Sequence, residues 1–182
     1  MQGSRCTVQG QEKLDNPIIH QIPIGALQVL TYIVACPVTR EAALIDPAGE
    51  EERLMKAITA EGVRVKYILN THGHADHVLG NRQMKAMLSA PVCMHEADDL
   101  FFSREEVRVA SEKELGLPPP EPADIRIKDE EVLDLGTLGI RVIHTPGHTP
   151  GSVCFLVQGN LFTGDTLFVG AAGRTDLTGA SL

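Results

Sequence analysis

The stretch Thr71-His72-Gly73-His74-Ala75-Asp76-His77 places three imidazoles and a carboxylate within six consecutive residues. Side chains at this spacing cannot all lie on one face of a helix or a strand, so we expect a loop wrapped around a charge. The small residues Gly73 and Ala75 let the backbone curl while the polar side chains converge. Placing a carboxylate beside clustered imidazoles costs free energy unless these groups pair with one another or bind a metal ion. The stretch therefore predicts a metal site.

The sequence on either side places this loop at the carboxyl end of a strand. Residues 65–69 form an apolar run typical of a buried strand, and residues 81–88 predict a helix. Open α/β folds bind their ligands at such strand ends. His148, in Thr-Pro-Gly-His-Thr-Pro-Gly, and Asp165, in Thr-Gly-Asp-Thr, also follow predicted strands beside glycine. From the residues alone, these two are either further ligands or turn residues that bond their own backbone.

The remaining pattern predicts a layered sandwich with helices outside. Strands are predicted at residues 18–24, 28–35, 42–45, 91–94, 125–127, 131–135, 140–144, 153–158 and 161–163, and helices at 50–60 and 96–115. Short connections between the first three strands favour an antiparallel meander. Prolines 118–120 and 122 preclude regular structure there. We expect two strand-rich halves, each with its own helices.

Composition narrows the class of partner. A chain of 182 residues with 43% hydrophobic content is expected to form one domain, preceded by a polar, disordered segment at residues 1–16 without a signal peptide. A net charge of −8 without a Lys/Arg cluster disfavours nucleic acid and membrane partners. The four cysteines are widely spaced, which favours reduced thiols in a cytoplasmic protein. The oligomeric state stays open.

The motifs THGHADH, TPGHTPGS and GDTLF in combination resemble the metallo-β-lactamase superfamily, and GRTDL at residues 173–177 resembles its glyoxalase II-like branch. Over about residues 18–179, the resemblance implies an α+β fold, a four-layer αββα sandwich with the metal site at the common edge of two sheets. By position it implies first-metal ligands His72, His74 and His148, second-metal ligands Asp76 and His77, and a bridging Asp165. Family members continue through another helix and strand to a last histidine ligand, so we expect the domain at residues 17–182 to lack them.

The branch implies hydrolysis of a small-molecule, glutathione-type thioester by a hydroxide held on Zn²⁺, of which we expect two ions. Asp76 would also orient that hydroxide as the catalytic residue, while Arg174 either binds an anionic substrate tail or forms a structural pair with Asp176 or another carboxylate. The nitrogen and oxygen donors also accept Fe²⁺. The alternative enzyme is therefore a mononuclear iron persulfide dioxygenase using His72, His148 and Asp165. A non-catalytic metal-stabilised module is a further alternative, and the absence of a sulfur ligand at position 165 disfavours β-lactamase activity.

Overall fold

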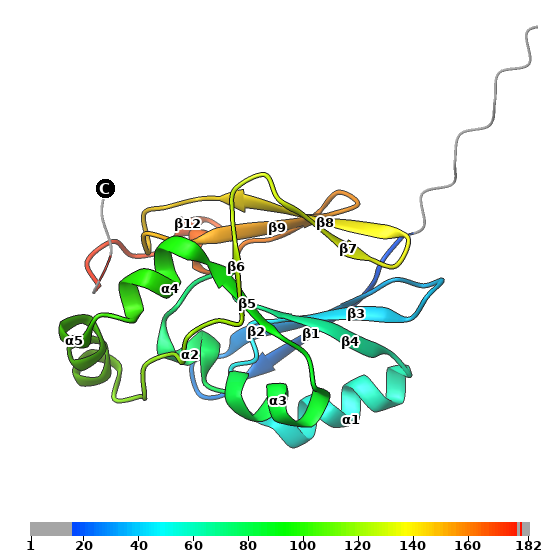
Figure 1. The fold of residues 1–182 in the computed structure, drawn as a ribbon, viewed down its shortest axis with the longest axis horizontal. Helices are drawn as coiled ribbons and strands as arrows, with labels where there is room; N and C mark the ends of the chain where they lie inside the picture. The colour runs from blue at the N-terminus through cyan, green and yellow to red at the C-terminus, as the bar shows by residue number, and fades with distance from the viewer. Residues whose placement is uncertain (1–15, 178, 180–182) are drawn as a thin grey trace, which may run out of the picture.

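The computed structural model describes residues 16–177 and 179, and it consists of two facing β-sheets with helices on the larger one (Figure 1). The larger sheet has the strand order β1 (Ile18–Ile24), β2 (Val29–Ala35), β3 (Glu41–Ile45), β4 (Arg64–Leu69), β5 (Val92–His95), β6 (Ile125–Ile127). The smaller sheet has the order β10 (Asn160–Phe162), β9 (Val153–Val157), β8 (Leu138–His144), β7 (Val132–Leu135). A short ribbon pairs β11 (Leu167–Phe168) with β12 (Ala171–Ala172).

The direction of the strands explains where functional side chains gather. The predicted antiparallel meander of β1, β2 and β3 is confirmed, and β3, β4, β5 and β6 then run parallel. Helices α1 (Glu51–Glu61) and α3 (Asn81–Leu88) provide the crossover connections that parallel strands need. The carboxyl ends of these parallel strands therefore meet at one edge of the sheet. Along the chain, α1 follows the end of β3, α2 (Ala75–Val78) follows β4, and α4 (Glu96–Phe102) follows β5 and leads into α5 (Glu105–Leu115).

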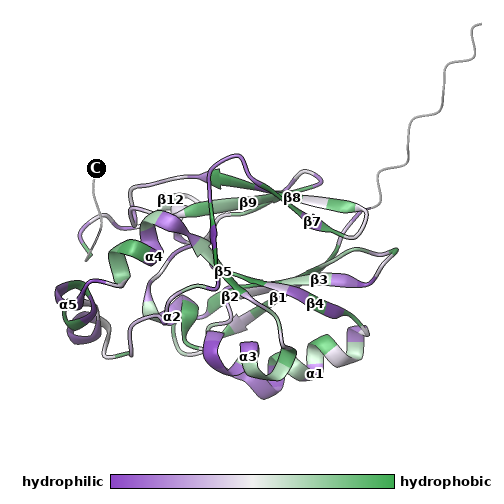
Figure 2. Ribbon diagram, viewed as in Figure 1, coloured by the Kyte–Doolittle hydropathy of each residue, from purple (hydrophilic) through white to green (hydrophobic). Residues whose placement is uncertain are grey.

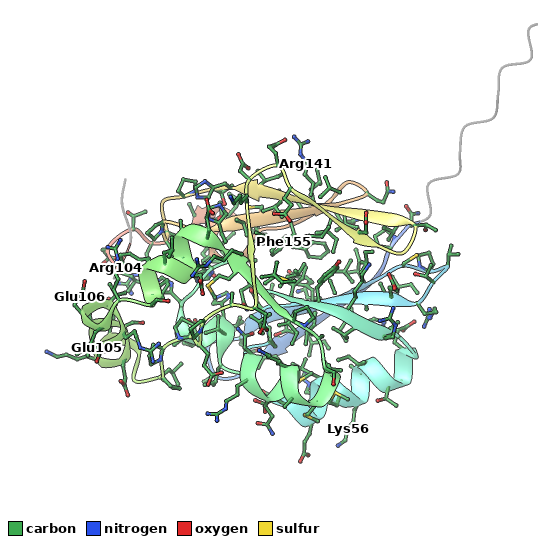
Figure 3. All side chains as sticks on the ribbon, viewed as in Figure 1. Lys56, Arg104, Glu105, Glu106, Arg141 and Phe155 are labelled. Carbon is green, nitrogen blue, oxygen red and sulfur yellow. The ribbon has the colours of Figure 1, made fainter. Side chains whose placement is uncertain are left out.

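Alternation along the strands separates two apolar cores. In β2, Val34 belongs to the core between the sheets, whereas its neighbour Ile33 belongs to the core under α1 and α3. Phe155 points into the space between the sheets, while Arg141 and Lys56 point outward (Figure 3). The strands β8 and β9 are largely hydrophobic and the outward side of α3 is hydrophilic (Figure 2). Burying one large side chain such as Phe155 contributes about 1.5–3 kcal/mol.

Three predicted elements differ in the structure. The helix at 96–115 is two helices, because the Ser103 hydroxyl donates to the Asp99 carbonyl at 2.5 Å and Arg104 is extended. Strand β6, which was expected in the second half of the sandwich, pairs with β5 and belongs to the larger sheet. The second half was also expected to have its own helices, but residues 125–177 contain strands and a 3₁₀ turn and no α-helix. The ligand stretch is only partly a loop, since Asp76 and His77 lie on α2.

Other expectations have mixed outcomes. Cys36, Cys93 and Cys154 are free and buried, as expected for reduced thiols, whereas Cys6 lies outside the described residues. Within the described segments, the helices are too short or too polar to cross a membrane. The predicted disorder of residues 1–16 falls, except for Asn16, outside the described part of the chain.

Candidate metal centre

Five of the six predicted ligand residues come together at the edge where the parallel strands end, and the sixth, Asp76, lies beside them without joining either group of close ligand atoms. His72 and His74 lie in the loop after β4, Asp76 and His77 on α2, His148 in the loop between β8 and β9, and Asp165 in the 3₁₀ turn after β10. Two groups have their ligand atoms within 4.8 Å of one another: His72 with His74 and His148, and His72 with His77 and Asp165. Two adjacent positions for an ion follow from this overlap.

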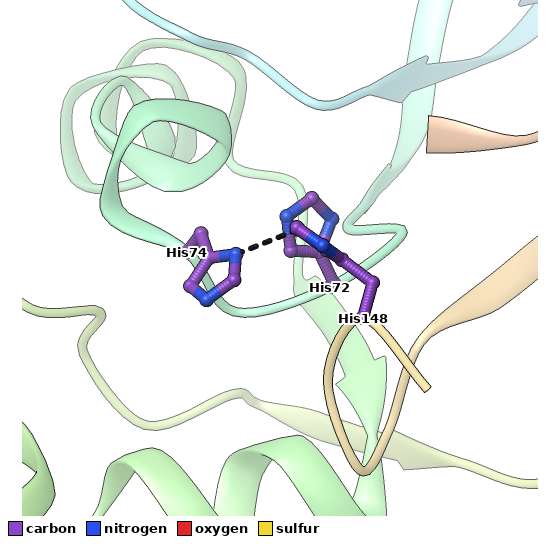
Figure 4. Close-up of side chains that lie close together, drawn as sticks. All are labelled: His72, His74 and His148. Atoms are coloured by element: carbon purple, nitrogen blue, oxygen red, sulfur yellow. Dashed lines mark hydrogen bonds between the residues drawn. The ribbon is translucent and has the colours of Figure 1, made fainter. Parts of the chain in front are cut away.

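The first position is built from three buried imidazoles (Figure 4). His74 Nδ1 lies 2.9 Å from His148 Nε2, and His72 Nε2 is buried without a hydrogen-bond partner among the described atoms. Burial and the neighbouring imidazoles hold the pKa of His72 well below its ordinary value, so its ring is neutral. A buried nitrogen lone pair without a partner is costly, and a metal ion supplies that partner.

Hydrogen bonds on the outer nitrogens fix which nitrogen of each ring faces the centre. Thr71 Oγ1 donates to Asp46 Oδ2 at 2.6 Å and therefore accepts from His72 Nδ1 at 3.1 Å. His77 Nδ1 donates to Asp46 Oδ2 at 3.0 Å, and His148 Nδ1 donates to the Arg174 carbonyl at 2.8 Å. In all three rings Nε2 therefore faces the centre, which is how metal-binding histidines are usually oriented. In His77 this nitrogen lies beside Asp165 and carries a proton while no ion is bound.

The second position is anionic. His77 Nε2 lies 3.3 Å from Asp165 Oδ1 and 3.9 Å from Asp76 Oδ2, while Asp165 Oδ2 lies 3.5 Å from His148 Nε2. Burial alone would lower the pKa of His77, but Asp165 and Asp46 raise it to about 10. Burial opposes ionisation of Asp165, yet His77 and the other imidazoles hold the pKa of its carboxyl below the ordinary value. The position therefore stabilises positive charge, and the place of Asp165 between the two groups fits a shared ligand.

Two buried aspartates that support the site were not identified as functional from the sequence. Asp46, just after β3, accepts from Thr71 N at 2.8 Å and from His77, and its place at a strand end was the only signal. Asp98, on α4, accepts from three donors near the ligands, and no local pattern marked it. Burial raises the pKa of Asp98 to about 6, although the three donors act in the opposite direction.

A pocket of about 640 Å³ opens beside the second position. Asp76, His77 and Asp165 line one part of it. Most of the remaining lining is apolar or uncharged, and it consists of Gln21, Leu27, Gln28, Val29, Leu30, Tyr32, Thr163, Gly164, Leu167, Phe168 and Val169. Apart from Asp76, His77 and Asp165, the lining residues are uncharged, so this part of the pocket wall suits a neutral, partly apolar group next to the ligands.

Arg174 lies where the second of the two sequence interpretations placed it. Its guanidinium pairs with Asp176, with Nε–Oδ1 2.7 Å and Nη2–Oδ2 2.9 Å, and both side chains are exposed. The guanidinium is not among the groups that line the described pocket, whereas the Arg174 carbonyl holds His148. A role for the Arg174 side chain in binding substrate stays a prediction.

Known proteins with this arrangement identify the family. The model of the metallo-beta-lactamase superfamily matches residues 24–182. The chain is similar to hydroxyacylglutathione hydrolase GloC of Haemophilus influenzae, with 36% identity over 163 residues, 87% of this chain and 76% of that protein.

Two solved structures share its fold. The BLEG-1 B3 metallo-beta-lactamase superposes with a TM-score of 0.79 at 35% identity, covering 90% of this chain and 79% of that one. TTHA1623, solved in a di-iron-bound form, superposes with a TM-score of 0.73 at 34% identity, covering 88% of this chain and 79% of that one. The expected α+β fold class of the metallo-beta-lactamase type is confirmed, although the α-helices of the described residues all precede β6. The chain belongs to the metallo-beta-lactamase superfamily.

Proposed function

We propose that this protein is a metal-dependent thioester hydrolase that acts on glutathione-type thioesters and binds two Zn²⁺ ions. The observation that carries the proposal is the position of Asp165, whose two oxygens lie 3.3 Å from His77 Nε2 and 3.5 Å from His148 Nε2. One carboxylate thus faces both ligand groups, as a ligand shared by two ions would. When bound, two ions held by these residues would polarise a substrate carbonyl and lower the pKa of bound water to near neutral.

The chain's own residues position water and substrate. Asp76 lines the pocket and is only partly buried, so its carboxylate can accept a hydrogen bond from water and orient a lone pair toward the substrate carbonyl. Tyr32 lines the same pocket, and its ring packs edge-on against Phe162 with centroids 4.9 Å apart. Burial and the charge of Asp46 raise the pKa of Tyr32, which keeps its hydroxyl a donor at neutral pH. A donor held there can bind the carbonyl oxygen of the substrate.

The leaving group and the acyl group both suit this pocket. A thiolate is a good leaving group and does not need to be protonated by a strong acid. The described lining therefore need not supply a general acid. The uncharged wall formed by Leu27, Leu30 and Phe168 suits a neutral acyl group. The similarity to a hydroxyacylglutathione hydrolase supports glutathione as the thiol. We further propose a cytoplasmic location, supported by the free buried cysteines, and small-molecule substrates rather than nucleic acid or membrane partners.

The mononuclear iron persulfide dioxygenase remains the alternative. It is favoured by the contact of His148 with Asp165 beside His72, which offers two imidazoles and one carboxylate. The similarity to a protein solved in a di-iron-bound form supports iron as the metal, but with two ions rather than one. Hydrolysis is better supported, because His74 Nδ1 lies 2.9 Å from His148 Nε2 and adds a third imidazole to that position.

Metal content and two assays test the proposal. Protein expressed without metal supplements is analysed for zinc and iron, then assayed for thiol release from S-lactoylglutathione and for oxygen uptake with glutathione persulfide. We expect zinc and thiol release, both lost in Asp165→Asn and kept in the control Asp134→Asn, whose side chain is exposed on β7. Oxygen uptake with one iron per chain and no thiol release would establish the alternative instead.

A further inference from the structure

The buried carboxylate of Asp98 joins the two loops that carry the first-position ligands. Its Oδ2 accepts from Gly73 N and from Thr149 Oγ1, each at 2.8 Å, and its Oδ1 accepts from Gly151 N at 2.6 Å. Gly73 lies between His72 and His74, and Thr149 directly follows His148. Asp98 is fully buried, so water does not compete for these three bonds.

The surrounding packing shows how closely α4 lies against both loops. A methyl group on Gly151 would lie 2.8 Å from the Asp98 Cβ, and one on Gly73 would lie 2.6 Å from the Phe102 Cε2. Glycine at both positions therefore lets the loop backbones reach the helix. The helix lies at the end of the sandwich near α2, and its first residue follows β5 directly (Figure 1). The larger sheet thus fixes the position of α4, and α4 can in turn fix the positions of the two ligand loops.

We propose that Asp98 is a positioning residue that sets the separation between the His72/His74 loop and His148, and so sets the metal affinity of the first position. An ionised carboxylate is an acceptor only, and this environment presents three donors to it. An asparagine in its place would turn an NH₂ group toward at least one of them, so one loop would be pushed away. The proposal requires that these residues bind a metal ion, and it does not require that the chain hydrolyse a thioester.

The next residue on the same helix provides a matched control. Asp99 is also buried, but its carboxylate accepts from Ala123 N and Arg126 Nε, each at 2.7 Å, and no bond described for it reaches either ligand loop. Asp98→Asn and Asp99→Asn therefore make the same chemical change at the same depth. They differ in whether a loop with metal ligands is attached.

Metal binding by the full chain is the readout. Zn²⁺ affinity is measured by competition with a chromophoric chelator, and the visible spectrum of the Co²⁺-loaded protein reports the ligand geometry. We expect Asp98→Asn to weaken first-site Zn²⁺ binding roughly 10- to 100-fold and to shift the Co²⁺ bands, as loss of a bond that orients a ligand does. We expect Asp99→Asn to leave both unchanged. Equal affinity in Asp98→Asn and the wild type, or equal losses in both variants, would overturn the proposal.

A milder pair covers the outcome in which Asp98→Asn does not fold. Thr149→Val removes one of the three donors while keeping the side-chain shape, and Thr149→Ser keeps that donor. We expect Zn²⁺ affinity to fall in the valine variant and to be restored in the serine variant, with the Co²⁺ spectrum following the same order. Identical affinities in the two variants would overturn the role of the Asp98 bonds. Loss of thioester cleavage in the wild type would leave this result unaffected, so the two failures are distinguishable.

Discussion

Adding a single methyl group at Gly73 should destabilise the protein and disturb the metal ligands on either side. The φ angle of Gly73 is not in the left-handed region, so Gly73→Ala adds no backbone strain of that kind. The new Cβ would lie 2.6 Å from Phe102 Cε2 and closer still to Cδ2. Carbon atoms in contact are ordinarily about 3.5–4.0 Å apart, so the ring or the loop must move by roughly 1 Å.

The size of the effect follows from how tightly Phe102 is held. Its side chain is 1% exposed, and its ring packs edge-on against His74 and Phe101, with centroid distances of 5.7 and 5.3 Å. It has no open space to move into, so we expect the overpacking cost of about 1–3 kcal/mol. With a urea m-value of about 2 kcal/mol/M, this cost should lower the unfolding midpoint by roughly 0.5–1.5 M.

The assay is urea unfolding of the metal-free protein in a chelating buffer, followed by Zn²⁺ affinity in the folded state. A second substitution, Phe102→Leu, removes the ring atoms that the methyl group meets. Gly73→Ala should therefore destabilise the Phe102→Leu background by much less, with a coupling energy on the order of 1 kcal/mol. The steric account would be refuted by a wild-type midpoint in Gly73→Ala, or by strict additivity of the two substitutions.

Four further outcomes are expected. Asp46→Asn should weaken the second metal ion more than the first, measured by stepwise Zn²⁺ titration, because Asp46 orients His77. Phe155→Ala should lower the free energy of unfolding by about 3–5 kcal/mol in urea, with unchanged m-value, because it empties the centre of the core between the sheets. Tyr32→Phe should lower kcat/KM for the thioester by roughly fivefold, the equivalent of one hydrogen bond of about 1 kcal/mol, with Zn²⁺ content unchanged. Lowering the pH should remove metal from the second position before the first, measured as the Zn²⁺ stoichiometry after dialysis, because the pKa of His77 is raised to about 10 and that of His72 is lowered.

The sequence was most informative where chemistry is local. The segment from His72 to His77 carries its own signal, and most strands and helices begin and end within one or two residues of the predicted bounds. The failures involve contacts between distant residues. Nothing near residues 125–127 shows that β6 pairs with Cys93 on β5, and the partners of Asp98 lie 25, 51 and 53 residues away. The role of such a carboxylate can be recognised only once the fold has placed its hydrogen-bond donors around it.

The two metal positions differ because opposite physical influences dominate their histidines. At the first position, burial and neighbouring imidazoles keep His72 neutral, so an incoming ion finds a lone pair already available. At the second, Asp46 and Asp165 hold a proton on His77, and an ion must displace that proton before the ring can bind it. The positive charge of this proton balances the negative charge of the buried carboxylates. A bound metal ion would supply the same positive charge. The anionic residues that make the second position attractive to a cation therefore also make protons its strongest competitors. The first position depends instead on the geometry of three buried imidazoles and on the carboxylate of Asp98, which bonds the loops that carry them.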